Sequence, residues 1–468
     1  MSRTRIIKGK LTEIIGGDYN IYSASNIVDN AVGEITEKGA ENGVSYGNPS
    51  RRPAGEIKAK CIVKFRPHGK YKDNPEFGFD WLREGDSGQP GDNWFGNIMG
   101  KYFEEASFIN PLTYTNGWTR DKIANPNGYF KKELSMYDKK LKSYKSFTVF
   151  WKLINKKPYL YTIPTLTLLK GKTAIFNLKI EIQEKPKKLI LEFKDKEAEK
   201  YLTLNLKEIG DVKNGKYEKF NYLKITCKES FSKEQILYVK ADDEICGALR
   251  IHPNSSEFRR NINVVFIKVK TDITGIATIG KPVIGGKDFF IKCCNQALVV
   301  PKIIEEKQSL DCTNNTFGRL FGINFKDFTG SGKLSTGAVG QKIVNITGMK
   351  DYLESRLKDQ FGDKYNGYKV LYFIGEEANW NGFSNYGWNT CVQFGKHNKA
   401  TITHETIHSL YLPHTFAGIS ERGAIPKYTY EATKTNNLMD YSHVATPPIE
   451  RFSLFIWQWN VLNSKIKI

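Results

Sequence analysis

The stretch KATITHETIHSLYLPH, residues 399–414, decides the architecture predicted for the C-terminal part of the chain. Its first two histidines, His404 and His408, stand four positions apart, so a helix would project both rings from one face. Proline disfavours helical geometry in the residue before it, so this helix should end at Leu412–Pro413. We therefore expect a helix followed by a turn that brings His414 back toward the other two histidines.

The three histidines predict a metal site. Two imidazoles at this spacing can bind one zinc ion at about 2.0–2.1 Å, and His414 supplies a third ligand. Glu405 directly follows the first ligand, where its carboxylate can act as general base on a water without binding the metal. A rival for the third ligand is Glu431, because some zinc sites of the HExxH type use a downstream glutamate as the third ligand. The sequence thus predicts one catalytic Zn²⁺ ion.

This motif resembles that of the metzincin clan of zinc peptidases, in which HExxHxxGxxH is followed by a turn that carries methionine. The resemblance covers residues 261–468, and the run Leu412–Phe416 is most similar to the pappalysin branch. It implies zinc ligands at His404, His408 and His414, a general base at Glu405 and a Met-turn at Met439.

One position departs from the metzincin pattern. Tyr411 stands where the clan has glycine, which serves a left-handed turn. A bulky residue in that conformation costs about 1 kcal/mol or more. The departure leaves the exact form of the turn open but removes no ligand.

Four other residues are candidates for the substrate side of the site. Tyr441, two positions after the methionine, could donate to a tetrahedral intermediate or could be a packed aromatic residue. Residues 388–394 are expected to form a strand that lines the substrate cleft, with Trp388, Cys391 and Phe394 as cleft residues. A polypeptide substrate would add beside this strand through main-chain hydrogen bonds, at an edge position that the resemblance implies.

The length of 468 residues allows several domains. The patterns predict a multidomain protein with β-rich N-terminal domains and an α/β or α+β metzincin-like catalytic domain. Residues 1–54 favour a short β-helix-like leader, with a flexible β-rich leader as the alternative. Residues 55–156 should form a β domain with long loops, and 157–260 an immunoglobulin-like sandwich. The catalytic domain should occupy 261–468.

Basic residues exceed acidic ones, with 70 Lys and Arg against 50 Asp and Glu and a net charge of +20. Residues 301–468 hold 19 Lys and Arg and 15 Asp and Glu, so most of the excess lies before them. This charge favours contact with acidic surfaces, or else marks a lysine-rich solvated β surface. No helix-turn-helix, zinc-finger or RNA-binding signature appears, so we expect no nucleic-acid partner.

The seven cysteines lack metal-ligand spacing and are expected to be buried or free thiols, with a Cys227–Cys246 bridge as the minor alternative. No run approaches the roughly 18 apolar residues that cross a bilayer. The basic N-terminus has no apolar segment after it, so no Sec signal peptide is expected. We expect synthesis in a bacterial cytoplasm and secretion or injection by a non-Sec system.

The N-terminal half resembles effectors of bacterial contractile injection systems, including type VI secretion, in its leader and in FGFDWLREGD, residues 77–86. The resemblance implies that residues 1–54 bind spike or tip proteins, and it raises an immunity protein as a further partner. Together with the zinc motif it predicts a secreted effector or toxin that is a zinc metalloendopeptidase. The alternatives are a spike adaptor with a catalytically silent zinc domain, and an envelope- or glycan-binding β protein.

Overall fold

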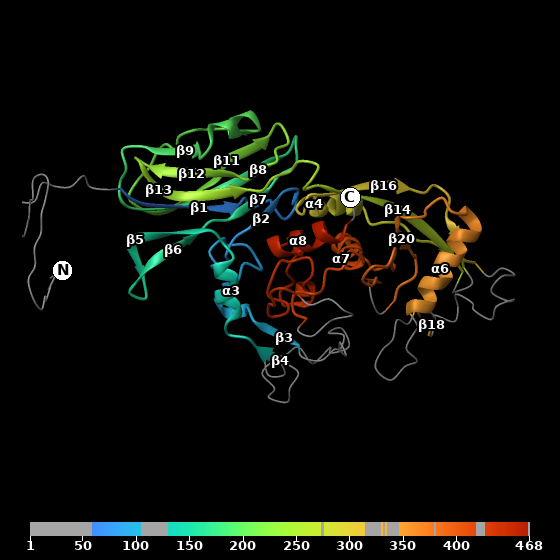
Figure 1. The fold of residues 1–468 in the computed structure, drawn as a ribbon. Coiled ribbons are helices and arrows are strands. Elements are labelled where there is room, and N and C mark those ends of the chain that lie inside the picture. Colours follow the sequence, from blue (N-terminus) through green and yellow to red (C-terminus); the bar gives the residue numbers. More distant parts are fainter. Residues whose placement is uncertain are drawn as a thin grey trace, which may run out of the picture. The chain divides into compact units, whose positions relative to one another are not determined.

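β-Strands form most of the regular structure in the described part of the chain, together with six α-helices (Figure 1). The structure is a computed structural model that describes residues 59–103, 130–272, 276–313, 329–330, 333–334, 346–378, 381–417 and 426–466. Several separate sheets are present, so the predicted β-rich architecture is confirmed. The predicted leader, residues 1–54, lies outside the described residues. None of the described helices is long and apolar enough to cross a membrane.

A four-stranded antiparallel sheet begins the described chain. Buried and less buried residues alternate along much of its longer strands, which is the pattern of a sheet with one covered face. In spatial order its strands are β1 (Lys60–Pro67), β8 (Thr173–Glu184), β11 (Gly215–Cys227) and β10 (Leu202–Leu204).

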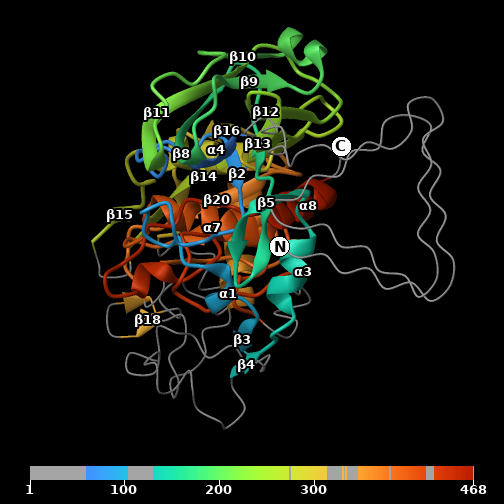
Figure 2. The same ribbon diagram turned by 90° about the vertical axis from the view of Figure 1, so that its left-hand side faces the viewer.

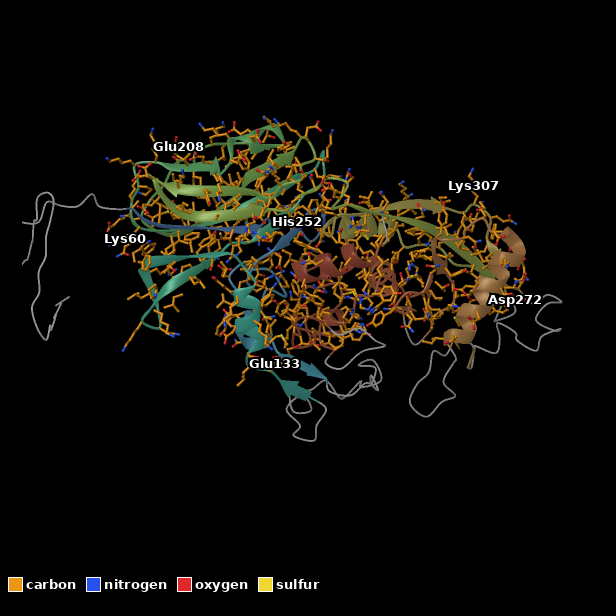
Figure 3. All side chains as sticks on the ribbon, in the orientation of Figure 1. Lys60, Glu133, Glu208, His252, Asp272 and Lys307 are labelled. Atoms are coloured by element: carbon orange, nitrogen blue, oxygen red, sulfur yellow. The ribbon has the colours of Figure 1, made fainter. Side chains whose placement is uncertain are left out.

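A five-stranded sheet contacts the first one. The ring centroids of Phe79 and Phe176, one from each sheet, are 4.9 Å apart. Side chains fill the space between the two sheets (Figure 3). In spatial order the strands of the second sheet are β2 (Gly78–Asp80), β7 (Thr165–Thr167), β13 (Glu244–Ile251), β12 (Gln235–Ala241) and β9 (Leu189–Phe193).

Both sheets join distant parts of the sequence. Strand β1 pairs with β8 and places Val63 opposite Ile180, and strand β2 pairs with β7. Segments 55–156 and 157–260 therefore share their sheets. The predicted domain boundaries and the immunoglobulin-like topology stay predictions.

Two-stranded ribbons and short helices make up the smaller elements of the described structure. Figure 2 shows the two-stranded ribbons from a second side. They pair β3 (Lys101–Phe103) with β4 (Phe130–Lys132), β5 (Ser146–Ile154) with β6 (Lys157–Thr162), and β18 (Thr329–Gly330) with β19 (Lys333–Leu334). The short helices are α1 (Phe95–Ile98), α3 (Met136–Lys142), η1 (Lys196–Lys200) and η3 (Ser442–Val444).

The C-terminal part contains a seven-stranded, mostly parallel sheet. Its central strand β14 pairs in parallel with β16, β17 and β20, and β20 pairs in parallel with β22. The strands are β14 (Arg260–Thr271), β15 (Thr278–Ile279), β16 (Val299–Glu305), β17 (Leu310–Asp311), β20 (Lys369–Phe373), β21 (Gly382–Phe383) and β22 (Thr390–Gln393).

Helices cover both faces of this sheet. Val392 of β22 packs in one core cluster with Leu353 of α6 (Ile346–Phe361), whereas the Cys391 thiol lies 3.8 Å from the Glu405 carbonyl oxygen of α7 (Lys399–Ser409). Successive residues of a strand point to opposite faces, so α6 and α7 lie on opposite sides of β22. The other two helices are α4 (Gly286–Asn295) and α8 (Ile456–Lys465).

Candidate metal centre

Helix α7 carries the histidine motif, and its ends follow from local chemistry. At its start the Asn398 side chain accepts a hydrogen bond from the Thr401 amide at 3.0 Å, and the Thr401 hydroxyl accepts one from the Asn398 amide at 3.4 Å. This reciprocal pair is a capping box, which satisfies amides that lack helical partners. The helix begins at Lys399. Every residue from Ala400 to Ser409 is buried.

The helix ends in a Schellman turn at Tyr411. Its φ is 69°, the left-handed conformation expected of the glycine that metzincins have here. The amides of Tyr411 and Leu412 donate to the carbonyls of His408 and Ile407, at 2.9 and 3.3 Å. A Cβ atom on Gly387 would lie 2.4 Å from the Tyr411 hydroxyl, so the phenol packs closely on that glycine. Tyr411 therefore adopts the left-handed conformation of this turn although it is not glycine.

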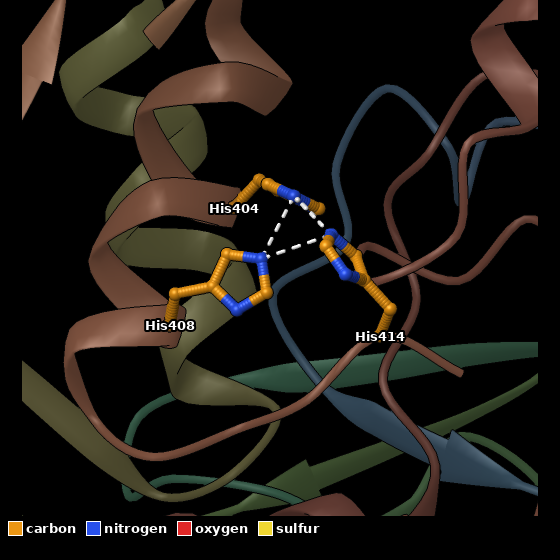
Figure 4. Close-up of side chains that lie close together, drawn as sticks. All are labelled: His404, His408 and His414. Carbon is orange, nitrogen blue, oxygen red and sulfur yellow. Dashed lines mark hydrogen bonds between the residues drawn. The ribbon is translucent and has the colours of Figure 1, made fainter. Parts of the chain in front are cut away.

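His404, His408 and His414 converge through their Nε2 atoms (Figure 4). The three Nε2–Nε2 distances are 3.1 Å from His404 to His408, 3.0 Å from His408 to His414, and 3.2 Å from His414 to His404. All three residues are buried. The helix ends at Ser409, earlier than the expected end at Leu412–Pro413, and the turn at Tyr411 brings the third ring to the first two.

Two of these rings have their tautomer set by backbone carbonyls. Nδ1 of His404 lies 2.7 Å from the Leu438 oxygen, and Nδ1 of His408 lies 2.8 Å from the Leu412 oxygen. A carbonyl oxygen only accepts, so each Nδ1 carries the proton and each Nε2 of a neutral ring presents a lone pair. Such carbonyl contacts are typical second partners of metal-binding histidines.

Burial keeps the His404 ring neutral. It lowers the pKa of His404 well below its usual range, and electrostatic interaction with His408, Arg451 and His414, which opposes a further positive charge on His404, lowers that pKa further. Two lone pairs then face each other 3.1 Å apart with no proton between them, an arrangement that a shared cation stabilises. Tetrahedral ligands at 2.0–2.1 Å from zinc are about 3.3–3.4 Å apart, close to the observed spacing. The group can hold a metal ion.

The turn at Met439 lies next to the histidine group and is hydrogen-bonded to it through the neighbouring backbone. Met439 is fully buried, and its carbonyl accepts a hydrogen bond from the Thr415 amide at 3.1 Å, next to His414. The Asp440 carboxylate accepts four hydrogen bonds within this loop, from the amides of Thr433, Thr435 and Tyr441 and from the Thr435 hydroxyl. Burial nevertheless raises the pKa of Asp440. The loop is thereby fixed where it contacts two ligands.

Arg451 is a residue at the site that sequence analysis missed. Its guanidinium is buried, donates to the Asp440 carbonyl at 3.1 Å, and lies 3.3 Å from Nδ1 of His404. Burial lowers the pKa of Arg451. It stands 47 positions after His404 and belongs to no local motif, so no spacing rule could identify it.

Aromatic side chains surround the three imidazoles. The Tyr441 ring centroid lies 4.7 Å from that of His414 and 5.8 Å from that of His404. Phe416 stacks on His414 at 5.0 Å, and Tyr386 lies 5.8 Å from His408. Tyr441 is therefore beside the predicted ligands, while its predicted role in donating to an intermediate stays a prediction.

Strand β21 runs beside the predicted general base. Glu405 is 9% exposed, and a Cβ atom on Gly382 would lie 3.2 Å from its Cγ. Strand β22 pairs with β20 on one side and with β21 on the other. The expectation that residues 388–394 form the sheet edge is therefore wrong, because β21 lies outside them.

The predicted cleft residues occupy different surroundings. Cys391 and Phe394 are fully buried, and Cys391 contacts helix α7 through its thiol. Phe394 belongs to the core cluster that includes α6, and Trp388 packs against that cluster. The cleft role of these three residues stays a prediction.

Glu431, the rival third ligand, is engaged elsewhere. Its carboxylate forms an ion pair with Lys101, and among the described residues the three histidines form a potential metal-binding group without it. His397 is held by its own bonds, since Nδ1 donates to the Phe394 carbonyl and Nε2 accepts from the Val283 amide. All seven cysteines are buried free thiols, as the main prediction had it.

A segment far earlier in the sequence is hydrogen-bonded to the loop beside His414, the predicted third ligand. The Glu431 amide donates to the Ile98 carbonyl at 2.7 Å, and the Gly100 amide donates to the Thr429 carbonyl at 3.0 Å. The Tyr430 amide in turn donates to the Thr415 carbonyl at 2.8 Å. Residues 98–100 thus join a hydrogen-bonded ladder that reaches the neighbour of His414.

The buried Arg83 side chain adds a second contact between these two parts of the chain, which are far apart in the sequence. Arg83 lies 3.7 Å from Asp92, donates to the Asn436 side chain at 3.3 Å, and lies over the Trp81 ring at 3.5 Å. Both charged side chains are almost completely buried. The Met-turn loop is therefore packed against the run FGFDWLREGD, to which the sequence had assigned no role at the site.

No protein-family model matches this chain, and no curated protein matches it.

Proposed function

We propose that this protein is a zinc-dependent metalloendopeptidase. The observation that carries the proposal is the convergence of three buried Nε2 atoms, two of them held in the metal-binding tautomer by carbonyls. The next residue after the first histidine is Glu405, which supplies a carboxylate on the same helix. Three imidazoles with an adjacent carboxylate are the donor set of a hydrolytic zinc site.

A zinc ion held by His404, His408 and His414 would supply a Lewis acid that activates a water and polarises the scissile carbonyl. Glu405 would take a proton from that water as it attacks, and would deliver the proton to the leaving amine. The neutral state of His404, which burial favours, keeps its Nε2 lone pair available as a ligand.

Two other groups would act around the reacting carbonyl. Tyr441 lies against the His414 ring, from where its hydroxyl would donate to the developing oxyanion. Strand β21 is the edge strand beside Glu405, so an extended polypeptide would pair with β21 rather than with β22.

The biological setting that we propose is delivery as an effector or toxin through a contractile, type VI-like injection system. It rests on the resemblance of the N-terminal half, with residues 1–54 as the segment that loads onto a spike or tip protein. Deletion of residues 1–54 should abolish export and leave peptide cleavage by the purified protein intact. Unchanged export of the deleted protein would contradict this part of the proposal.

The competing function is a spike adaptor whose zinc domain is catalytically silent. Both functions predict bound zinc, but only the peptidase requires Glu405. We expect Glu405→Ala to fold, to retain stoichiometric zinc and to lose cleavage of a denatured protein substrate. Wild-type protein that binds zinc yet cleaves no polypeptide in a broad substrate panel would favour the adaptor.

A further inference from the structure

The ribbon of β5 and β6 is a separate two-stranded sheet with a free turn (Figure 1). Ile154 pairs with Lys157, and the two residues between them, Asn155 and Lys156, have positive φ values of 49° and 64°. Two left-handed residues form the tight turn that matches the twist of a hairpin. The tip is therefore a defined structure.

One face of the ribbon fixes it to the sandwich sheets. Val149, Tyr159 and Tyr161 are buried in a cluster with Ile62 and Ala248. The Tyr161 hydroxyl also donates to the Val63 carbonyl at 2.8 Å. The base of the ribbon is thus anchored.

The outer parts of the ribbon expose large apolar side chains. Phe150 is 78% exposed, Leu153 61%, Ile154 48% and Leu160 39%. Single exposed apolar residues are ordinary on a protein surface, but four such residues within one short hairpin are a concentration that favours an interaction site.

All the charged side chains in this stretch of the sequence are positive. Residues 139–180 contain ten lysines and no Asp, Glu or Arg. Most of these lysines pair with carboxylates from other segments, namely Lys139, Lys140, Lys145, Lys152, Lys170 and Lys172. Within the described residues, Lys156 and Lys157 at the tip have no such ion pair. Uncompensated positive charge therefore coincides with the exposed apolar side chains.

We propose that the tip of the β5–β6 ribbon docks on an anionic lipid membrane. Apolar side chains would enter the interfacial region of the bilayer, and the two lysines would contact acidic headgroups. A hairpin tip with both features suits a flat, deformable anionic surface. The proposal is independent of the metal centre and of any peptidase activity.

Vesicle flotation with the full-length protein tests this proposal. We expect binding to vesicles of phosphatidylcholine with 30% phosphatidylglycerol, weaker binding in high salt, and little binding to pure phosphatidylcholine. Lys156→Glu with Lys157→Glu should weaken binding about 30-fold, and Phe150→Ser with Leu153→Ser about tenfold or more.

Matched surface changes elsewhere serve as controls. Phe220→Ser removes another exposed aromatic side chain, and Lys187→Glu with Lys188→Glu reverses another exposed lysine pair. These controls should bind like wild type, and all variants should keep the wild-type melting temperature because the altered side chains are exposed. The proposal is overturned if wild type ignores anionic vesicles, or if the tip and control variants bind equally.

The apolar variant also separates a membrane from a soluble polyanion. A polyanion such as heparin would be held by the lysines alone, so Phe150→Ser with Leu153→Ser should leave heparin binding unchanged while vesicle binding falls. If this variant loses both vesicle binding and heparin binding, or loses neither, insertion of the apolar tip is contradicted.

Discussion

Helix α7 and the segment 78–101 both shape the candidate metal centre, but by different means. The helix supplies two of the predicted ligands and the predicted base within five residues, through a spacing that is visible in the sequence. The earlier segment supplies no ligand and reaches the site through the ladder at Glu431 and through Arg83. The predicted chemistry of the site is thus local, whereas the loop beside His414 also makes contacts across more than 300 residues.

Removal of a ligand should have the largest effect. His414→Ala leaves two imidazoles and should abolish stoichiometric zinc binding and peptide cleavage together, as measured by metal analysis and a peptidase assay. His68→Gln, a half-buried histidine outside the group, is the control and should retain both. Full zinc affinity and activity in His414→Ala would refute the assignment of the third ligand.

Loss of the buried contacts of Arg83 should lower the stability of the fold but leave zinc binding intact. Arg83→Met leaves the Asp92 carboxylate buried and unpaired, and should lower the free energy of unfolding by about 3 kcal/mol. Zinc stoichiometry below the unfolding transition should remain one per chain.

An exposed ion pair between the same two parts of the chain offers a matched control. Lys72 and Glu450 lie 3.1 Å apart at the surface, so Lys72→Met should change the free energy of unfolding by less than about 1 kcal/mol. Chemical denaturation measures both variants. Equal effects would show that the buried contact near the Met-turn has no special weight.

Acid should destabilise the fold through histidines near the site. Burial, with a contribution from Arg451, lowers the pKa of His443 to about 3, whereas an unfolded histidine titrates near 6.5. The unfolded state therefore binds the proton first, so the stability associated with this neutral ring is lost as pH falls from 6.5 toward 3. His443→Gln should flatten the stability profile of metal-free protein over that window. An unchanged profile would contradict burial of a neutral His443.

The turn after α7 should show the smallest effect. Tyr411→Gly relieves a left-handed tyrosine but removes the packing on Gly387, so the free energy of unfolding should change by less than about 1 kcal/mol. Tyr411→Ala keeps the strain and loses the packing, so it should be the less stable of the two. Thermal melts compare them, and a more stable alanine variant would contradict the strain.

The sequence predicted the parts of the site that depend on short spacing. The helix and the three converging histidines follow from residues 399–414, and the structure brings the rings together, whereas the form of the turn at Tyr411 was left open. Arg451 and Arg83 could not be predicted, because their places depend on tertiary packing. The edge strand was misplaced for the same reason: a pairing as short as that of β21 leaves no periodic pattern.

The sheets of the N-terminal half show the same limit of prediction from sequence patterns. Alternating residues predicted strands in segments 55–156 and 157–260 separately. Alternation shows which residues face a core but does not show which strands are neighbours, so the pairing of β1 with β8 was not foreseen.

X-ray absorption spectroscopy of the zinc-loaded protein tests the central claim most directly. The account predicts one zinc per chain with three imidazole nitrogens in its first shell at about 2.0–2.1 Å. A shell with fewer than three imidazoles, or a purified protein that takes up no zinc, would contradict it.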